Sequence, residues 1–289
     1  MTINRWLKEN ASRLDGKTVA ISGSTGGIGR ELCDLAAGLG ASLILIDRNE
    51  KKSKALAEEI LKKYPEAFVT RIVADMENID SVKAASEALL QTNVDFLILN
   101  AGAYAIPRKK CSTGYDNVFQ INFLSPYYLA RRLFPKISER GGRIIAVSSI
   151  AHNYSKTDLE DTDFSTRNKA SLVYGNAKRR LTYALSDIYG DSGALAITHP
   201  GITFTNITAH YPKLIFAIIK YPMKVIFMKP RRAAISILSG IYQPTAKNEW
   251  IGPRLFNVWG LPKRKRLTTA DSDEVRRISE NAEEIFSSL

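Results

Sequence analysis

The sequence predicts an α/β fold, with one doubly wound parallel sheet of about seven strands and helices on both of its faces. Short apolar, β-branched runs alternate with longer amphipathic stretches over the first two thirds of the chain. A glycine-rich turn joins the first run to an amphipathic stretch. The 289 residues, 45% of them apolar, suffice for one large core. We therefore expect a single domain over residues 1–289.

The expected strands are the apolar runs bounded by amphipathic stretches. They cover residues 18–22, 42–47, 68–74, 95–100, 143–148 and 194–199, with a last strand near 254–258. The segments between them, such as 50–64, show helical spacing with outer faces rich in lysine and glutamate. A final helix is expected after Asp271, which suits an N-cap because Glu274 follows three residues later.

The net charge of +12 is concentrated in one part of the chain. Residues 211–266 contain twelve Lys or Arg and a single acidic residue, Glu249, which places +11 of the charge there. The remaining residues nearly balance. A general nucleic-acid-binding surface is therefore a poor explanation, and a local anionic partner is a better one.

Cysteine content and apolar runs indicate the compartment. Cys33 and Cys111 are too few for a disulfide framework, which fits a reducing environment. The first twenty residues contain no apolar signal-peptide core. The apolar stretch 214–228 is interrupted by two lysines and a proline, and is shorter than the roughly 20 residues of a spanning helix. We expect no transmembrane helix and a cytoplasmic location.

The glycine-rich turn predicts a nucleotide site. Gly23, Ser24, Gly27, Ile28 and Gly29 lie between the first expected strand and the next amphipathic stretch. Glycines at this junction allow backbone N–H groups to approach a pyrophosphate, and the helix N-terminus adds partial positive charge. No Gly-Lys-Ser/Thr run follows, so the turn is not a P-loop.

The end of the second strand bears on the choice of nucleotide. Asp47 lies twenty-four residues beyond Gly23, where an acid that binds an adenosine ribose is expected. Its carboxylate would accept the ribose hydroxyls and repel a 2′-phosphate, which favours NAD. Arg48 follows directly and could pair with a 2′-phosphate, so NADP is the alternative.

Three side chains form a candidate catalytic set. Tyr174 and Lys178 are four residues apart on a segment with helical spacing, which places the ammonium beside the phenol. A nearby cation lowers a phenol pKa from about 10 and makes tyrosine a usable acid and base. Ser149 follows a strand at the edge where such sheets bind ligands, and its hydroxyl can donate to a substrate carbonyl.

Together these motifs resemble the short-chain dehydrogenase/reductase family along nearly the whole chain, which implies a Rossmann-type fold. The resemblance implies that Tyr174 exchanges the proton and that Ser149 polarises the carbonyl. Lys178 would bind the nicotinamide ribose and lower the phenol pKa, and Asn122 would hold a water that links Lys178 to solvent. The remaining cofactor contacts that it implies are Asp75, Met76, Asn100, Ala101, Gly102, Pro200, Gly201, Thr203 and Thr205.

Pro126 provides a separate physical reason to expect a water at Asn122. Proline lacks an N–H, so in a continuous helix the carbonyl of Asn122 loses its usual partner and is free to hold a water.

A basic, apolar segment at about 206–232 occupies the family's substrate-lid position. Its lysines would align on one face of a continuous helix, which suits an interface with anionic lipids through residues 211–232. The other interpretation is a hydrophobic lid over the active site with a solvated lysine edge. Both interpretations predict a lipophilic substrate.

These observations predict an NAD(P)-dependent oxidoreductase that moves a hydride between nicotinamide and a lipophilic secondary alcohol or ketone. Retinol-dehydrogenase-like members are the most similar, through the long interval between Ser149 and Tyr174 and the His199-Pro200-Gly201 run. The alternatives are an NAD-dependent epimerase or isomerase on the same scaffold and a cofactor-binding, membrane-associated regulator. The family often forms homo-oligomers. No metal is expected, because the three histidines lack ligand spacing.

Overall fold

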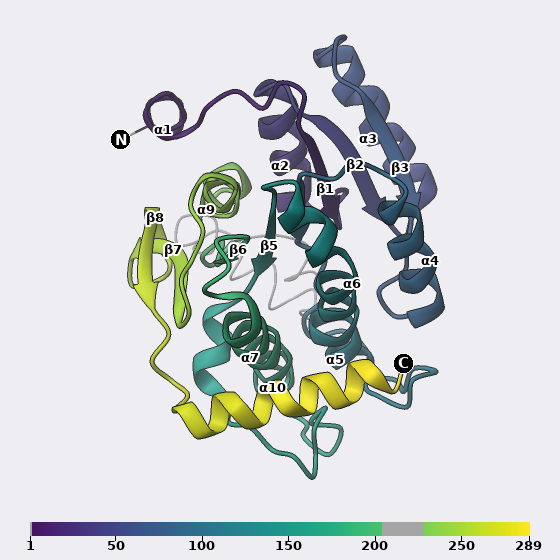
Figure 1. Cartoon of the computed structure of the whole chain (residues 1–289), viewed down its shortest axis with the longest axis vertical. Coiled ribbons are helices and arrows are strands. Elements are labelled where there is room, and N and C mark those ends of the chain that lie inside the picture. Colours follow the sequence, from purple (N-terminus) through teal and green to yellow (C-terminus); the bar gives the residue numbers. More distant parts are fainter. Residues whose placement is uncertain (1, 204–227) are drawn as a thin grey trace, which may run out of the picture.

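The computed structural model describes residues 2–203 and 228–289 (Figure 1). Thr205 and most of the segment 206–232 lie outside the described residues. The described strands form one eight-stranded sheet in the order β3-β2-β1-β4-β5-β6-β7-β8. The strands are β1 (Thr18–Ser22), β2 (Ser42–Asp47), β3 (Val69–Val73), β4 (Phe96–Leu99), β5 (Arg143–Val147), β6 (Leu195–Thr198), β7 (Glu249–Leu255) and β8 (Trp259–Arg266).

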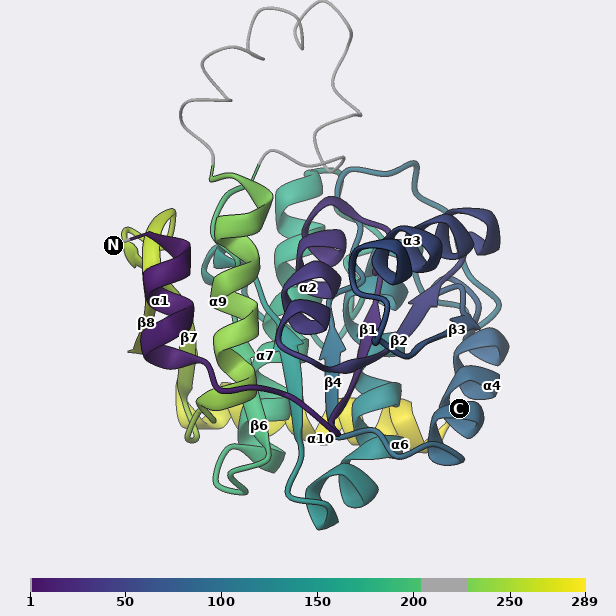
Figure 2. The ribbon, with the colours of Figure 1, turned by 90° about the horizontal axis from the view of Figure 1, so that it is seen from above.

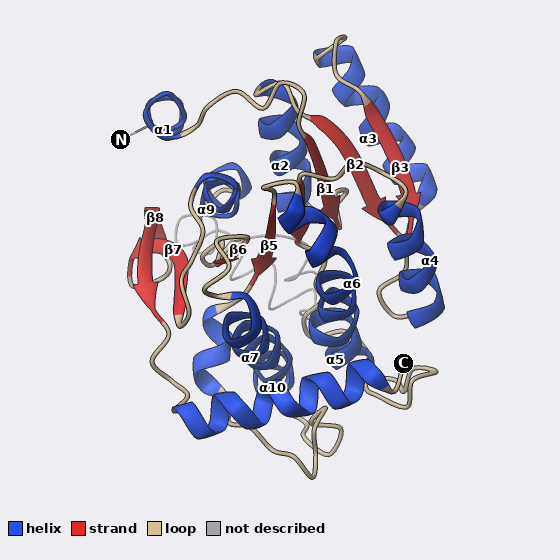
Figure 3. Ribbon diagram, viewed as in Figure 1, coloured by secondary structure: helices blue, strands red, loops and turns tan. Residues whose placement is uncertain are grey.

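Helices cover both faces of the sheet, as predicted (Figures 2 and 3). The longer helices are α1 (Ile3–Asn10), α2 (Gly27–Gly38), α3 (Glu50–Lys63), α4 (Ile79–Leu90), α6 (Ser125–Glu139), α7 (Ala170–Tyr189), α9 (Pro230–Tyr242) and α10 (Ser272–Ser287). Three short helices precede α6 or α7: α5 (Asn117–Phe119), the π-helical turn η1 (Gln120–Leu124) and the 3₁₀ turn η2 (Ile150–Tyr154).

Alternating side chains of the strands supply two cores. Val19 and Ile21 of β1 pack with α2, α3 and α9, whereas Ala20 between them packs with α4, α6 and α7. Helix α10 lies outside α7 and extends the second layer (Figure 1). Its N-cap is Asp271, whose side chain accepts the Glu274 N–H at 2.8 Å, as predicted.

The C-terminal part of the sheet differs from the prediction. The strand expected at 254–258 is the end of β7 and a turn, and β8 pairs with β7 in the antiparallel direction. Strand β8 escaped prediction because its second half is a run of basic residues, which shows no apolar alternation. Charged residues are tolerated at a sheet edge and protect it from pairing with other chains.

None of the helices in the described residues is long and apolar enough to cross a membrane. Cys33 and Cys111 are both free thiols. The predicted single domain and cytoplasmic location stay predictions.

Candidate active site

The topology brings the predicted site residues to one edge of the sheet. The strand order reverses between β1 and β4, which run side by side and lead to helices on opposite faces. Ligands of doubly wound sheets bind at the carboxyl ends of strands beside such a switch point. The glycine-rich turn follows β1, Asn100 follows β4, and Ser149 follows β5 two residues after Val147.

The glycine-rich turn is closed too tightly for side chains at two positions. Gly23 has φ +66°, and a Cβ there would lie 3.0 Å from the Cα of Ala101. A Cβ on Gly29 would lie 2.2 Å from the carbonyl oxygen of Gly23. Helix α2 begins after Gly26 with no side-chain cap, so its first N–H groups are available to a phosphate. The cradle therefore fits a dinucleotide pyrophosphate.

Replacing Gly29 with alanine tests this cradle. The new Cβ must displace backbone of the turn, so we expect cofactor affinity to fall about tenfold or more. Isothermal titration with NADH and NADPH measures the change. Gly26→Ala is the matched control, because a Cβ there meets only the Gly23 carbonyl oxygen at 3.3 Å. Equal, unchanged affinity in both variants would contradict the tight-turn account.

The turn after β4 anchors the glycine-rich turn from the other side. Asn100 donates from Nδ2 to the carbonyl oxygens of Ser22 at 3.0 Å and Gly23 at 3.1 Å. The N–H of Ala101 donates to the Ser22 hydroxyl at 3.0 Å. Asn100 and Ala101 thus shape the predicted cofactor cleft through its backbone.

Asp47 has a role that the sequence did not predict. Its carboxylate accepts the Thr25 N–H at 3.0 Å, the Thr25 hydroxyl at 2.9 Å and the Ser24 hydroxyl. The residue is 4% exposed. Asp47 therefore clamps the glycine-rich turn, and its oxygens are largely occupied before any ribose binds. Arg48, by contrast, is exposed.

Ser149, Tyr174 and Lys178 come together as predicted. Ser149 accepts the Ala151 N–H at 3.2 Å, and its hydroxyl lies close enough to Tyr174 to act on the pKa of the phenol. Lys178 lies one helical turn after Tyr174, with Nζ 5.9 Å from the phenol ring centroid. The ammonium donates to the Val147 carbonyl oxygen at 2.8 Å and is buried.

The pKa of Tyr174 in the protein alone differs from the prediction. Desolvation raises it to about 12, although the hydrogen bond from Ser149 acts to lower it. Desolvation also lowers the pKa of Lys178 to about 8. Burial is the largest influence on the phenol, and the Lys178 ammonium donates to the Val147 carbonyl oxygen. A lowered phenol pKa therefore requires a further positive charge in the cleft.

Gly175 explains how Ser149 and Tyr174 meet. A Cβ at this position would lie 2.5 Å from the Ala151 carbonyl oxygen and 2.6 Å from the Ser155 hydroxyl. Helix α7 can thus approach η2 closely. Sequence reasoning missed this residue, although a glycine inside a helix is unfavourable unless close packing requires it.

Asn122 and Gly102 complete the cluster. Asn122 donates from Nδ2 to the carbonyl oxygens of Ala103 and Val118, both at 2.8 Å. A Cβ on Gly102 would lie 2.9 Å from Asn122 Oδ1 and 3.8 Å from Lys178 Nζ. Asn122 lies within η1, so the helix is irregular where Pro126 deprives it of an N–H.

The other predicted cofactor residues lie at the same edge or just outside it. Asp75 accepts the Glu77 N–H, and Met76 is buried with its carbonyl accepting the Ser125 hydroxyl. Pro200 and Gly201 follow β6, and Thr203 forms an isolated bridge with Met228. The roles of all these residues toward a cofactor stay predictions.

Comparison with known proteins decides the family. The family model described as short chain dehydrogenase matches residues 17–159. Short-chain dehydrogenase TIC 32 A, chloroplastic, of Brassica napus is 32% identical over 213 residues, which cover 67% of this chain and 66% of the relative. The chain belongs to the short-chain dehydrogenase family.

Other relatives agree with this assignment. Retinol dehydrogenase 12 of Homo sapiens is 26% identical to this chain over 267 residues, which cover 85% of the chain and 83% of the relative. An uncharacterized protein from Mycobacterium Paratuberculosis has the same fold, with a TM-score of 0.76, 22% identity and coverage of 96% and 95%. The short-chain dehydrogenase from Sphingobium yanoikuyae in complex with NADPH has a TM-score of 0.59, 22% identity and coverage of 78% and 84%.

Sequence reasoning missed the aromatic surroundings of the catalytic set. The Tyr104 ring packs edge-on against Tyr174, with centroids 5.4 Å apart. His152 donates from Nδ1 to the Ser149 carbonyl oxygen at 2.6 Å, and its ring meets Trp250 edge-on. His152 thus holds the segment that contains the predicted catalytic serine, Ser149. In the described residues, no three His, Cys, Asp or Glu side chains are grouped to hold a metal ion.

The buried histidines His152 and His199, which pack against Trp250, predict that the protein loses stability in acid. Desolvation lowers the pKa of His152 to about 4 and that of His199 to about 3, with positive Arg179 and Lys265 acting in the same direction. The unfolded chain binds these protons near pH 6.5, whereas the folded chain does not. Stability is therefore lost as pH falls below 6.5 and declines further toward 4 and 3.

Thermal unfolding between pH 7 and 4 measures this loss. The amide nitrogen of His152→Asn replaces Nδ1 as a donor, and that of His199→Gln replaces Nε2, but neither amide titrates. We therefore expect each variant to flatten the slope of Tm against pH. A slope equal to that of the wild type in both variants would contradict the assignment to these histidines.

Proposed function

We propose that this protein is an NAD(P)-dependent oxidoreductase that interconverts a lipophilic secondary alcohol and a ketone. The observation that carries the proposal is the grouping of Ser149, Tyr174 and buried Lys178 at the same sheet edge as the glycine-rich turn. Family membership supports the reaction class.

The protein's groups have separate tasks in this reaction. A bound nicotinamide supplies or accepts the hydride. Ser149 donates to the carbonyl oxygen as negative charge develops, and Tyr174 holds the proton that this oxygen gains or loses. Lys178 places a positive charge near the phenol, and Asn122 fixes the adjacent turn by its two hydrogen bonds to backbone carbonyls.

A turnover assay tests this function. Wild-type protein is mixed with NADH or NADPH and a panel of lipophilic ketones, and with the oxidised cofactors and the corresponding alcohols. We expect an absorbance change at 340 nm with at least one compound. Failure to bind either cofactor would overturn the proposal. Cofactor binding with substrate isomerisation and no net absorbance change would favour the epimerase alternative.

We propose NADP(H) as the preferred cofactor. The sequence favoured NAD through Asp47, but that carboxylate is buried and bonded to Ser24 and Thr25. Arg48, which is exposed, is then the residue that the sequence predicts as a ligand for a 2′-phosphate. The relative from Sphingobium yanoikuyae was solved with NADPH, which is consistent with this preference.

Arg48→Gln tests the cofactor preference. We expect the KM for NADPH to rise about tenfold or more and the KM for NADH to change less than about twofold. Lys51→Gln, an exposed charge on the adjacent helix α3, is the matched control. A wild-type preference for NADH, or equal effects of Arg48→Gln on both cofactors, would overturn the proposal.

The lipophilic substrate class is supported by the apolar composition of residues 206–232 and by the name of retinol dehydrogenase 12.

The predicted homo-oligomer remains a proposal as well. Helix α10 packs on α7, and its Phe286 meets Tyr127 and Tyr128 of α6. An assembly through α6 and α7 would therefore have to use the surface that α10 leaves uncovered.

A further inference from the structure

The tip of the β7–β8 hairpin exposes a cluster of large apolar side chains. Leu255 and Trp259 are directly paired across the hairpin and are 53% and 39% exposed. Phe256, in the turn between them, is 83% exposed. Trp6 and Trp250 are 4% and 3% exposed, so Trp259 is the one tryptophan of the three that reaches the surface.

The backbone of this tip is held in an unfavourable conformation. Phe256 and Asn257 have φ of +50° and +59°; asparagine tolerates the left-handed region, but a bulky phenylalanine rarely adopts it. His199 donates from Nε2 to the Asn257 carbonyl oxygen at 3.0 Å, and Lys265 donates to the Pro253 carbonyl oxygen at 2.6 Å. Hydrogen bonds from His199 and Lys265 thus stabilise a turn that projects Phe256 into solvent.

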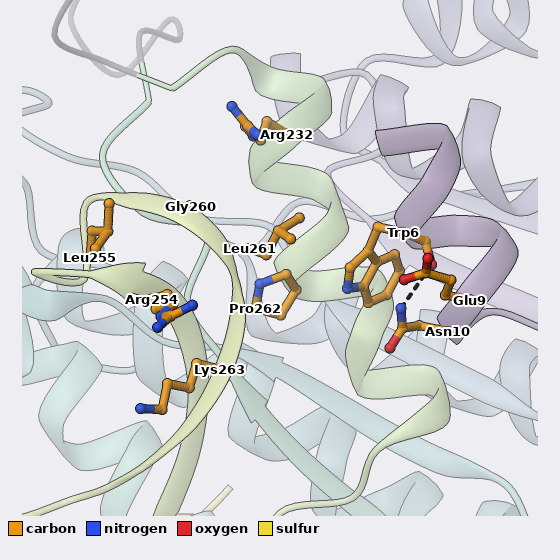
Figure 4. A pocket seen from close by; sticks show the side chains of 10 residues that line it. All are labelled: Trp6, Glu9, Asn10, Arg232, Arg254, Leu255, Gly260, Leu261, Pro262 and Lys263. Carbon is orange, nitrogen blue, oxygen red and sulfur yellow. Dashed lines mark hydrogen bonds between the residues drawn. The ribbon is translucent and has the colours of Figure 1, made fainter. Parts of the chain in front are cut away.

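Positive charge flanks the apolar tip. Arg254 and Lys263 are exposed, and neither forms an ion pair with another described residue. Together with Arg232 of α9 they line a cavity of about 790 Å³ between the hairpin and α1, in which Glu9 is the acidic group (Figure 4). The cavity contains none of the predicted catalytic residues.

The tip lies at the same sheet edge as the catalytic set. Strands β5, β6 and β7 are neighbours and run parallel to one another. Leu255 ends β7 and Ser149 follows β5, so the two residues lie at the same edge of the sheet, two strands apart. The tip also touches the turn after β6, because a Cβ on Gly201 would lie 2.8 Å from the Val258 carbonyl oxygen. A surface that covers the tip therefore lies at the same sheet edge as the predicted catalytic residues.

We propose that this tip inserts into the interfacial region of anionic lipid bilayers, with Phe256 and Trp259 among the lipid chains and Arg254 and Lys263 at the headgroups. Aromatic side chains favour the membrane interface, and basic residues near it are attracted to anionic lipids. This inference rests on the proposed function, since the contact would turn the active-site edge of the sheet toward a bilayer that holds a lipophilic substrate.

Vesicle binding of the full chain tests the proposal. Large vesicles of phosphatidylcholine with 30% phosphatidylserine are compared with pure phosphatidylcholine at low and high salt, by flotation. Brominated lipids in the same vesicles report contact with Trp259 through fluorescence quenching. Phe256→Ser is the test variant, and Phe68→Ser, a 68% exposed phenylalanine beside β3, is the matched control.

We expect salt-sensitive binding to the anionic vesicles, about tenfold weaker for Phe256→Ser and unchanged for Phe68→Ser. Quenching should disappear in Trp259→Phe. No vesicle binding, or equal binding by both serine variants, would overturn the proposal; so would a dimer in sedimentation equilibrium that Phe256→Ser dissociates. Cofactor titration without vesicles separates the two claims, because failure of the wild type to bind either NADH or NADPH counts against the proposed function alone.

Discussion

Tyr174→Phe is expected to lower kcat by about 10²- to 10⁴-fold, because it removes the group that holds the transferred proton. The phenylalanine ring can retain the edge-on contact with Tyr104, and helix α7 is otherwise unchanged. Cofactor affinity should therefore stay within about threefold of the wild type, since the lost hydroxyl lies beside Ser149 rather than at the glycine-rich turn. Stopped-flow absorbance at 340 nm and cofactor titration measure the two quantities.

Tyr154→Phe is the matched control for this loss. Tyr154 ends η2 in the same region, but its side chain is 62% exposed. We expect its kcat to equal that of the wild type. Comparable activity in Tyr174→Phe and Tyr154→Phe would show that the proton comes from another group.

Glu274→Gln is expected to destabilise the fold by about 3 kcal/mol, the largest effect on stability that the structure predicts. Arg179 is buried in α7, and its guanidinium donates to Glu274 from Nε at 2.8 Å and from a terminal nitrogen at 2.6 Å. The same carboxylate accepts the Thr157 N–H at 3.1 Å. A neutral amide leaves a buried positive charge without its counter-ion. Urea unfolding measures the difference.

The control for this substitution lies on the same helix. Glu280→Gln removes an exposed carboxylate that pairs with Arg276 four residues earlier, and such pairs contribute little. We expect a change below about 0.5 kcal/mol. Arg179→Met with Glu274→Gln should recover part of the loss, because both charges are then removed. Equal stability of the two single variants, Glu274→Gln and Glu280→Gln, would contradict the buried-pair account.

The Glu274–Arg179 pair also predicts a pH effect. Burial acts to raise the pKa of Glu274, but hydrogen bonds from Arg179 and Thr157 outweigh it, so the pKa lies below its ordinary value. A carboxyl group whose pKa is depressed in the folded state stabilises the fold above its unfolded pKa, and that contribution is lost on acidification. The Glu274→Gln variant should therefore show a smaller loss of stability between pH 5 and 3.

Local patterns were sufficient to predict the first six strands and the edge on which the site lies. Strands such as Thr18–Ser22 alternate between two cores, so their composition is apolar throughout, and the carboxyl ends of parallel strands meet by topology. The hairpin was predicted less well. Its turn depends on Phe256 in the left-handed region, a conformation that a phenylalanine does not signal in the sequence.

Contacts between segments far apart in the sequence could not be predicted. The clamp from Asp47 to Thr25 joins two turns twenty-two residues apart, and the Glu274–Arg179 pair spans ninety-five. Spacing alone placed Tyr174 beside Lys178, but the pKa of the phenol depends on burial and on which acceptor the ammonium contacts. These quantities arise only once the tertiary structure is formed.

Hydride transfer is the central claim, and isotope transfer tests it most directly. NADPH that carries deuterium at the reactive position of the nicotinamide is incubated with wild-type protein and a lipophilic ketone, and the alcohol is analysed by mass spectrometry. The proposed function predicts one deuterium on the carbinol carbon of the product and none with Tyr174→Phe over the same time. Product that forms without deuterium, while the labelled cofactor is unchanged, would contradict it.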